Sequence, residues 1–183
     1  MGSSSTASGL PGQAWAHKVG KIDMRPLEPG DWGPEALAAR AQIAEAFHRF
    51  GMSFDEARVD VLSSCFTEDS VFEVVQGSLE VRTRLESRQE IADVLPERIR
   101  NQDDQRRHLM SNVLVEELDL AAGTAKALAY SVVTVASDGL QLGASVIYTG
   151  DLRREADGCW RFTYFFIGMD EYLASGRQET ATA

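Results

Sequence analysis

The sequence predicts an α+β domain in which three helices precede a strongly curved, mostly antiparallel sheet. Apolar residues recur at helical spacing before residue 100, whereas four long strand-like runs follow it, at roughly 106–118, 124–137, 141–153 and 159–168. The dipeptides Asp138-Gly139 and Asp157-Gly158 separate the last three runs, as turns separate the strands of β-hairpins. Helices that are segregated from a meander of long strands are typical of the α+β class.

The chain divides into a leader, one domain and a tail. Residues 1–33 are rich in Gly, Ser and Pro and lack an apolar period, so we expect a flexible leader, from which Trp15 and Trp32 could dock on the domain or on a second subunit. Residues 34–173 form the single domain, because a chain of 183 residues can enclose one core and a ligand cavity. Residues 174–183 are expected to be a disordered tail.

The first two predicted helices have clear start signals. Gly33-Pro34 begins the first helix, because proline is favoured at the first helical position, and its apolar stripe extends to about residue 51. The stretch Ser53–Glu56 is a capping-box pattern, which predicts that a second helix starts there and continues to Phe66.

A hairpin and a third helix complete the first half of the chain. Strands at 71–75 and 79–85 are expected to pair around Gln76-Gly77-Ser78. A second capping box at Ser87–Glu90 predicts the start of the third helix, which Pro96 should bend or end.

Composition excludes several classes of function. The net charge of −10 disfavours binding to nucleic acid and to anionic lipid, both of which require concentrated positive charge. The most basic stretch, 98–107, contains two aspartates and is interpreted as a solvated loop face. No run of about 18 apolar residues is present that could span a membrane.

Two cysteines, Cys65 and Cys159, lie far apart and without metal-site spacing. We interpret them as buried thiols in a reducing compartment. The N-terminal stretch lacks the continuous apolar region of a secretory signal, so a cytoplasmic location is expected. No motif for a nucleotide, metal or other cofactor is found, and we expect none to be needed.

A histidine stands out in the first long strand. In RRHLMSN (106–112), alternation places His108 and Asn112 on one face, and both faces of the strand carry apolar residues. A lone strand histidine is more often a satisfied core or rim residue than a catalytic group. Its role therefore depends on whether another part of the chain supplies a partner.

Three stretches carry a resemblance to a known family: FHRFGMSFDEARVDVLSSCFTEDSVFEV (47–74), RRHLMSNVLVEEL (106–118) and DGCWRFTYFFIGMD (157–170). Together with the order of elements, they resemble the SnoaL-like group of the nuclear transport factor 2-like superfamily, which includes scytalone dehydratase and bile-acid dehydratases. The resemblance spans about residues 35–172 and implies a cone-shaped, curved sheet with the helices packed on it.

The resemblance implies a catalytic pair. In the dehydratases of this group, an aspartate after the first helix pairs with a histidine on the first long strand, and the matching residues here are Asp55 and His108. A tyrosine usually precedes that aspartate, where this sequence has Phe54. Scytalone dehydratase has a second histidine on the next strand, where this sequence has Val133.

Asp55 also has a purely structural interpretation. A carboxylate two residues after the Ser53 cap would stabilise a helix N-terminus by about 0.3–1 kcal/mol without any catalysis. As a catalytic residue, it would instead hold the imidazole of His108 in one tautomer for general acid–base work. The two roles are compatible.

Further residues complete the predicted substrate site. Asn112 would donate to a carbonyl or enolate oxygen, or else satisfy neighbouring backbone. By family likeness, the cavity lining would include Ser131 and Val133 on one strand and Ser145, Ile147 and Thr149 on the next, whereas Tyr130, Tyr148 and Tyr164 would be packing residues. Such a lining suits a flat hydrophobic ligand, such as a polycyclic or terpenoid compound.

The sequence thus favours a cofactor-independent lyase or isomerase, of dehydratase or cyclase type, that acts on a small hydrophobic carbonyl compound, with secondary metabolism as the expected setting. His108 would remove a proton α to the carbonyl and Asp55 would orient it.

Two alternatives remain open. RRHLMSNVLV also resembles the structural small subunit of aromatic-ring-hydroxylating dioxygenases, which predicts a cone filled by side chains. A hydrophobic-ligand-binding module would have an open pocket without the His108–Asp55 pair. Members of the fold commonly pair through the outer face of the sheet, so the resemblance also implies a homodimer.

Overall fold

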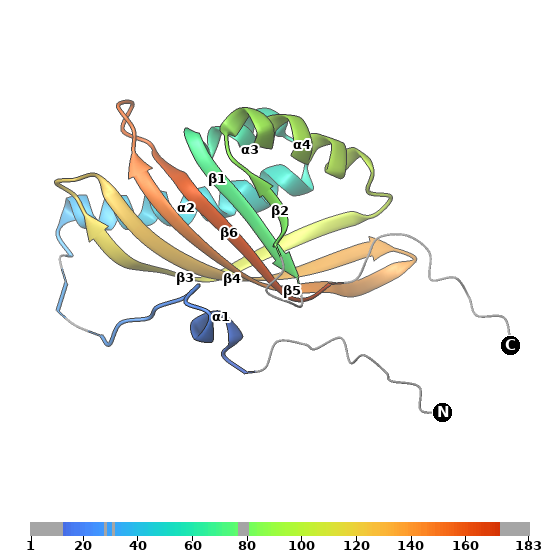
Figure 1. Ribbon diagram of the computed structural model, residues 1–183, viewed down its shortest axis with the longest axis horizontal. Coiled ribbons are helices and arrows are strands. Elements are labelled where there is room, and N and C mark those ends of the chain that lie inside the picture. Colours follow the sequence, from blue (N-terminus) through green and yellow to red (C-terminus); the bar gives the residue numbers. More distant parts are fainter. Residues whose placement is uncertain (1–12, 28, 31, 77–80, 173–183) are drawn as a thin grey trace, which may run out of the picture.

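The computed structural model describes residues 13–27, 29–30, 32–76 and 81–172. Six strands form one sheet in the order β2-β1-β6-β5-β4-β3, and Figure 1 shows its strong curvature. The strands are β1 (Phe66–Gln76), β2 (Val81–Leu85), β3 (Gln105–Asp119), β4 (Thr124–Ser137), β5 (Gly139–Arg154) and β6 (Trp160–Tyr172). Every neighbouring pair is antiparallel except β1 and β6, which are parallel. The predicted α+β class, the antiparallel pairing of the two hairpin strands and the four long strands are confirmed, whereas the turn predicted at Gly77-Ser78 lies outside the described residues.

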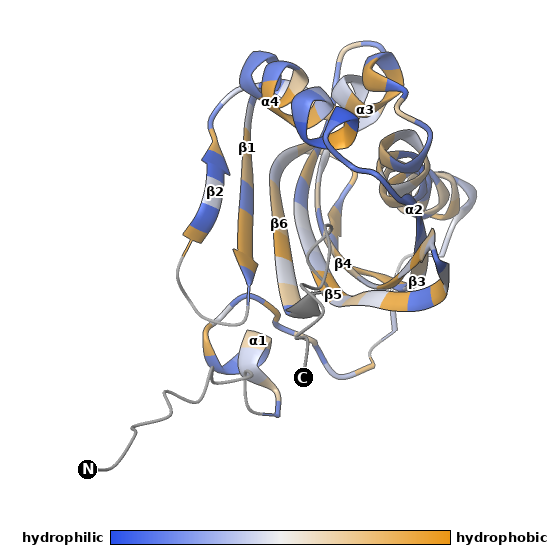
Figure 2. Ribbon diagram, turned by 90° about the vertical axis from the view of Figure 1, so that its right-hand side faces the viewer, coloured by the Kyte–Doolittle hydropathy of each residue, from blue (hydrophilic) through white to orange (hydrophobic). Residues whose placement is uncertain are grey.

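Three helices pack on one side of the sheet: α2 (Pro34–Asp55), α3 (Val59–Ser64) and α4 (Arg88–Arg100). Figure 2 shows that the sheet curls toward α2, which lies on its concave side, and that α3 and α4 lie at the top of this view. Aromatic rings fill much of the core beneath α2, with Phe50 and Phe165 4.7 Å apart between centroids and both at most 2% exposed. This core fixes α2 against the inner face of the sheet.

The start of the second predicted helix was wrong. Ser53 caps nothing: it is buried inside α2, and its hydroxyl donates to the carbonyl of Phe50. The first helix instead continues to Asp55, because its apolar stripe remains in contact with the sheet beyond Gly51. The second predicted capping box, Ser87–Glu90, does begin a helix: the Ser87 side chain accepts a hydrogen bond from the backbone amide of Glu90 at the start of α4. Pro96 lies within α4, which continues for one more turn.

Part of the segment that was expected to be a mobile leader lies against the outer face of the sheet. The short helix α1 (Trp15–Lys18) places the Trp15 indole N–H 2.5 Å from a carboxylate oxygen of Asp170. Lys21 follows, and its ammonium donates to Glu73 and to the hydroxyl of Tyr164, both at 2.9 Å. The predicted tail, 174–183, lies outside the described residues.

Glu73 should make this attachment sensitive to acid. Burial opposes ionisation of the Glu73 carboxyl, but hydrogen bonds and charge from Lys21 outweigh burial and lower its pKa below the ordinary 4.5. A carboxyl with a lowered folded pKa stabilises the folded state above its unfolded pKa, and this contribution is lost as the pH falls through the folded value. We expect acidification below about pH 4 to weaken the attachment by about 1 kcal/mol. Hydrogen exchange at the Trp15 indole should then accelerate, and in a Lys21→Gln variant it should be fast already at neutral pH.

Two other expectations can be compared with the structure. Cys65 is buried, and burial raises the pKa of its thiol to about 12, but Cys159 is exposed, so the expectation of two buried thiols was wrong for Cys159. Asp157-Gly158 forms a tight turn that holds Cys159 at the surface.

Among the described residues, no helix has both the length and the apolar character needed to cross a membrane.

Candidate active site

A cavity of about 110 Å³ lies between the inner face of the sheet and helices α2 and α4. Its wall is mostly apolar, and the polar side chains in it are Arg98, Arg106, His108 and Tyr148. The apolar lining comprises Phe50, Phe54, Phe72, Val74, Leu95, Val133, Val135, Ala144, Val146, Ile167 and Met169, with Gly143. This volume is smaller than the roughly 150 Å³ of an apolar cavity that is known to hold benzene.

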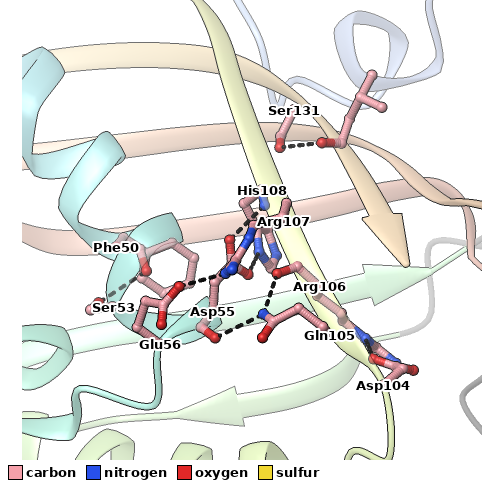
Figure 3. A network of polar contacts seen from close by, with 11 residues as sticks. Phe50, Ser53, Asp55, Glu56, Asp104, Gln105, Arg106, Arg107, His108 and Ser131 are labelled. Atoms are coloured by element: carbon pink, nitrogen blue, oxygen red, sulfur yellow. Dashed lines mark hydrogen bonds and ion pairs between the residues drawn. The ribbon is translucent and has the colours of Figure 1, made fainter. Parts of the chain in front are cut away.

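Asp55 and His108 are in contact at the wall of this cavity (Figure 3). One carboxylate oxygen of Asp55 lies 2.6 Å from Nδ1 of the His108 ring, and the other accepts the backbone N–H of His108 at 2.7 Å. The two side chains are only 5% and 11% exposed. Since the carboxylate accepts at Nδ1, the neutral ring carries its proton there, and Nε2 is left with a lone pair.

The end of α2 is fastened to the start of β3 by two further contacts. The Arg107 guanidinium donates to the Glu56 carboxylate at 2.6 Å, and the Gln105 side-chain amide donates to the backbone carbonyl of Asp55 at 3.2 Å (Figure 3). Asp55 is the last residue of α2, so its carboxylate stands at the negative end of the helix dipole, where a negative charge is unfavourable. The helix-capping interpretation of Asp55 was therefore wrong, and its partner is His108.

Gly51 allows α2 and β3 to approach this closely. A Cβ atom at Gly51 would lie 3.0 Å from the Cβ of His108 and 3.3 Å from the terminal methyl of Met110. Both distances are tighter than ordinary van der Waals contact, so a side chain here would push β3 away from the helix that carries Asp55.

The Gly51→Ala substitution should disturb the site more than the fold. Alanine gains about 1 kcal/mol of helix propensity over glycine, which offsets much of the cost of overpacking, about 1–3 kcal/mol. We therefore expect the free energy of unfolding to change by less than about 2 kcal/mol, while the Asp55–His108 hydrogen bond lengthens. The downfield ring-proton resonance of His108 in an NMR spectrum measures this. An unshifted resonance would contradict the proposed role of Gly51.

Tyr148 is a cavity residue that the sequence interpretation assigned to packing. Its ring is stacked on Phe165 and meets Phe50 at 6.0 Å, and the residue is 2% exposed. Burial, together with the nearby charge of Asp55, raises the pKa of its hydroxyl, so that Tyr148 stays a neutral hydrogen-bond donor. No group in the described part of the chain is hydrogen-bonded to this hydroxyl, although it lines the same cavity as His108.

The basic stretch 98–107 also differs from its interpretation as a solvated loop face. Arg98 lies on α4 and Arg106 on β3, and both line the cavity. Arg106 is 8% exposed and makes a two-pronged ion pair with Asp104, at 2.8 and 3.2 Å. The sequence could have predicted that Arg106 faces the cavity, because residues two apart in a strand, here Arg106 and His108, point to the same face.

The lining predicted for β5 was wrong by one residue. Phe54 and Val133 line the cavity as expected, and Val133 is the register partner of His108. Ser131 is buried, but it is not part of the cavity lining. On β5 the cavity receives Ala144, Val146 and Tyr148, whereas Ser145, Ile147 and Thr149 are outside it. Bulges shift the β5–β6 register at Asp151/Leu152 and at Ser145/Val146. The residues of β5 were assigned to the cavity by counting back from the turn at Asp157-Gly158, and one inserted residue is enough to assign a strand residue to the opposite face of the sheet.

Asn112 does not accompany His108 into the cavity. It adopts a left-handed backbone conformation with φ of 51°, is exposed, and lies where the β3–β4 register shifts between Ser111 and Leu114. Asparagine tolerates this backbone conformation better than most residues, so Asn112 suits the β-bulge that it occupies. Its predicted placement on the face of His108 was therefore wrong, because alternation fails across a bulge.

Comparison with solved structures places the chain among proteins of the same fold. An NTF2-like protein with a cystatin-like fold from Novosphingobium aromaticivorans is 23% identical, with a TM-score of 0.64 over 74% of this chain and 84% of that one. A protein from the same organism, assigned provisionally as the β subunit of an aromatic-ring-hydroxylating dioxygenase, is 17% identical, with a TM-score of 0.65 over 76% and 94% of the two chains. Both likenesses establish the fold alone.

A third structure, from Catenulispora acidiphila, was solved in complex with S-DNPA. It is 27% identical to this chain, with a TM-score of 0.60 over 74% of this chain and 95% of that one. No curated protein matches the sequence significantly. The model of the SnoaL-like domain matches residues 35–165, which include Asp55, His108 and Tyr148. The chain therefore belongs to the SnoaL-like family of the NTF2-like fold.

Proposed function

We propose that this protein is a cofactor-independent lyase or isomerase that acts on a small hydrophobic carbonyl compound by general acid–base catalysis. The observation that carries the proposal is the 2.6 Å contact between Asp55 and the His108 ring at the wall of a mostly apolar cavity. A general base must lie within reach of a substrate proton, and the cavity provides that space beside Nε2.

Each polar group at this end of the cavity has a distinct role. Nε2 of His108 takes the proton α to the substrate carbonyl, and Asp55 stabilises the positive charge that forms on the ring while staying ionised itself. The electron pair moves onto the carbonyl oxygen, to which the Tyr148 hydroxyl donates. The enolate then expels a leaving group, shifts a double bond or closes a ring, and His108 returns the proton.

The enzyme proposal has more support than either alternative. A structural dioxygenase subunit would have its cone filled by side chains, yet here a cavity of about 110 Å³ remains beside a buried ionisable pair. A simple binding module has no need for a carboxylate held against a histidine, which costs desolvation free energy. The relative from Catenulispora acidiphila, in complex with S-DNPA, supports a small-molecule ligand for this chain as well. We retain the homodimer and the cytoplasmic location as predictions.

Proton abstraction can be tested without knowledge of the natural substrate. The cyclic ketone 2-indanone has acidic α protons, and their replacement by deuterium in D₂O is followed by proton NMR. We expect the wild-type protein to accelerate this exchange above the rate in buffer alone. The His48→Gln variant is the control and should be equally active, because His48 is exposed on α2 and does not line the cavity. Exchange at the buffer rate in the wild type would contradict the proposal.

A further inference from the structure

We propose that the substrate carries a carboxylate, which Arg98 and Arg106 bind at the end of the cavity away from Asp55. This inference rests on the proposed function and specifies its substrate class as a hydrophobic carbonyl compound with one anionic group. It is carried by the distribution of charge around the cavity.

The lining of the cavity is basic in an acidic protein. The chain contains 28 acidic and 18 basic residues, yet among the described residues that line the cavity none is acidic and two are arginines. Guanidinium groups beside apolar side chains favour a ligand that is hydrophobic and carries a negative charge. Low-dielectric walls strengthen the attraction of these groups for an anion, since little water competes with it.

The two arginines come from different elements and differ in burial. Arg106 is held by its two-pronged pairing with the Asp104 carboxylate, whose side chain is only 4% exposed. Asp104 offsets much of the charge of Arg106, so the net positive charge comes chiefly from Arg98. Arg98 is exposed on α4, and its guanidinium donates to the neutral hydroxyl of Thr83 at 2.9 Å. Together they suit a single carboxylate: one rigid donor group within the wall and one adjustable group at its solvent side.

The charges also fix the orientation of the ligand. The Asp55 carboxylate contacts Nδ1 of the His108 ring and would repel a second carboxylate, whereas Arg106 precedes His108 by two residues on the same face of β3. The anionic group of the ligand would therefore lie at the arginines, and the reacting carbon would lie next to His108. Binding energy from the remote carboxylate would position the proton that His108 removes.

Paired probes isolate the charge of the ligand. We would measure binding of 3-phenylpropionate and of its neutral amide, 3-phenylpropanamide, to the full chain by titration calorimetry at pH 8. We expect the acid to bind about tenfold more tightly than the amide, and Arg98→Gln to reduce this preference to about threefold or less. Arg100→Gln is the matched control, because Arg100 is exposed on the same helix but does not line the cavity. It should leave the preference unchanged.

Two further variants remove ambiguity. Replacing Arg106 alone would leave the buried Asp104 unpaired, so Arg106→Gln is combined with Asp104→Asn. This double variant should also lose the preference for the acid over the amide. His108→Gln should keep it, which excludes attraction to the imidazole as its source.

Each outcome decides between the two proposals. Equal binding of acid and amide by the wild type, or binding of neither, would overturn the carboxylate site, as would an unchanged preference in both arginine variants. These results would leave α-proton exchange of the neutral 2-indanone untouched. Conversely, a preference for the acid without any exchange would overturn the proposed reaction and retain the site.

Discussion

The His108→Gln substitution is expected to lower the rate of α-proton exchange by about 10²–10⁴-fold while leaving the fold intact. Glutamine preserves volume and polarity but cannot accept a proton at neutral pH. The backbone N–H of His108 would still donate to Asp55, so the end of α2 stays fastened to β3. The exchange of 2-indanone in D₂O measures the rate, and thermal unfolding measures the stability.

Asp55→Asn provides a second test of the same pair. Its side chain can still accept the backbone N–H of His108, but it no longer carries the charge that stabilises a protonated ring, and its amide can favour the other tautomer. We expect exchange to fall by a factor similar to that for His108→Gln. The double variant should be little worse than either single variant, because residues that act as one unit are not additive. Independent, multiplicative losses would show that Asp55 and His108 do not act together.

The sequence predicted the fold because its helices and strands depend on regular signals, whereas this pair was predicted only by the family resemblance. Long alternating strands, Asp-Gly turns and helical apolar stripes each depend on local spacing, and the cone-like curvature of the sheet followed from the resemblance. Asp55 and His108 are 53 residues apart and were paired by the resemblance. Their contact required that Asp55 end one helix, although the Ser53 signal indicated that it began another.

The cavity could not be predicted in the same way, because its lining depends on irregular features. The bulges at Asn112 and along β6 exchange the faces of strands, so that Asn112 and Ser145 leave the cavity while Tyr148 enters it. Arg106 was missed for a different reason: alternation places it on the face of His108, but its polar neighbours in sequence favoured a solvated loop. Its ion pair with Asp104 is visible only in the folded structure. Charged residues inside a pocket look, in sequence, like those of a solvated loop.

Tyr148→Phe is expected to lower the exchange rate by about 10²-fold, because it removes one hydrogen-bond donor to the developing enolate. The ring contacts with Phe50 and Phe165 remain, so stability should change little. Tyr130→Phe is the matched control, since Tyr130 is 42% exposed and does not line the cavity.

The pH dependence of exchange sharpens this test of Tyr148. Its pKa is raised by burial and by the charge of Asp55, so the hydroxyl stays protonated in the folded protein at and above the ordinary value of 10. A group with a raised folded pKa contributes stability that is lost as the pH rises through that higher value. Below pH 10 the wild-type rate should therefore show no decline from ionisation of Tyr148, and the ratio of wild-type to Tyr148→Phe rates should stay constant.

If Tyr148→Phe retained the full rate while His108→Gln lost it, the enolate oxygen would be stabilised by another group. The guanidiniums of Arg98 and Arg106 are the remaining charged donors in the lining, and that result would reverse the orientation proposed for the substrate.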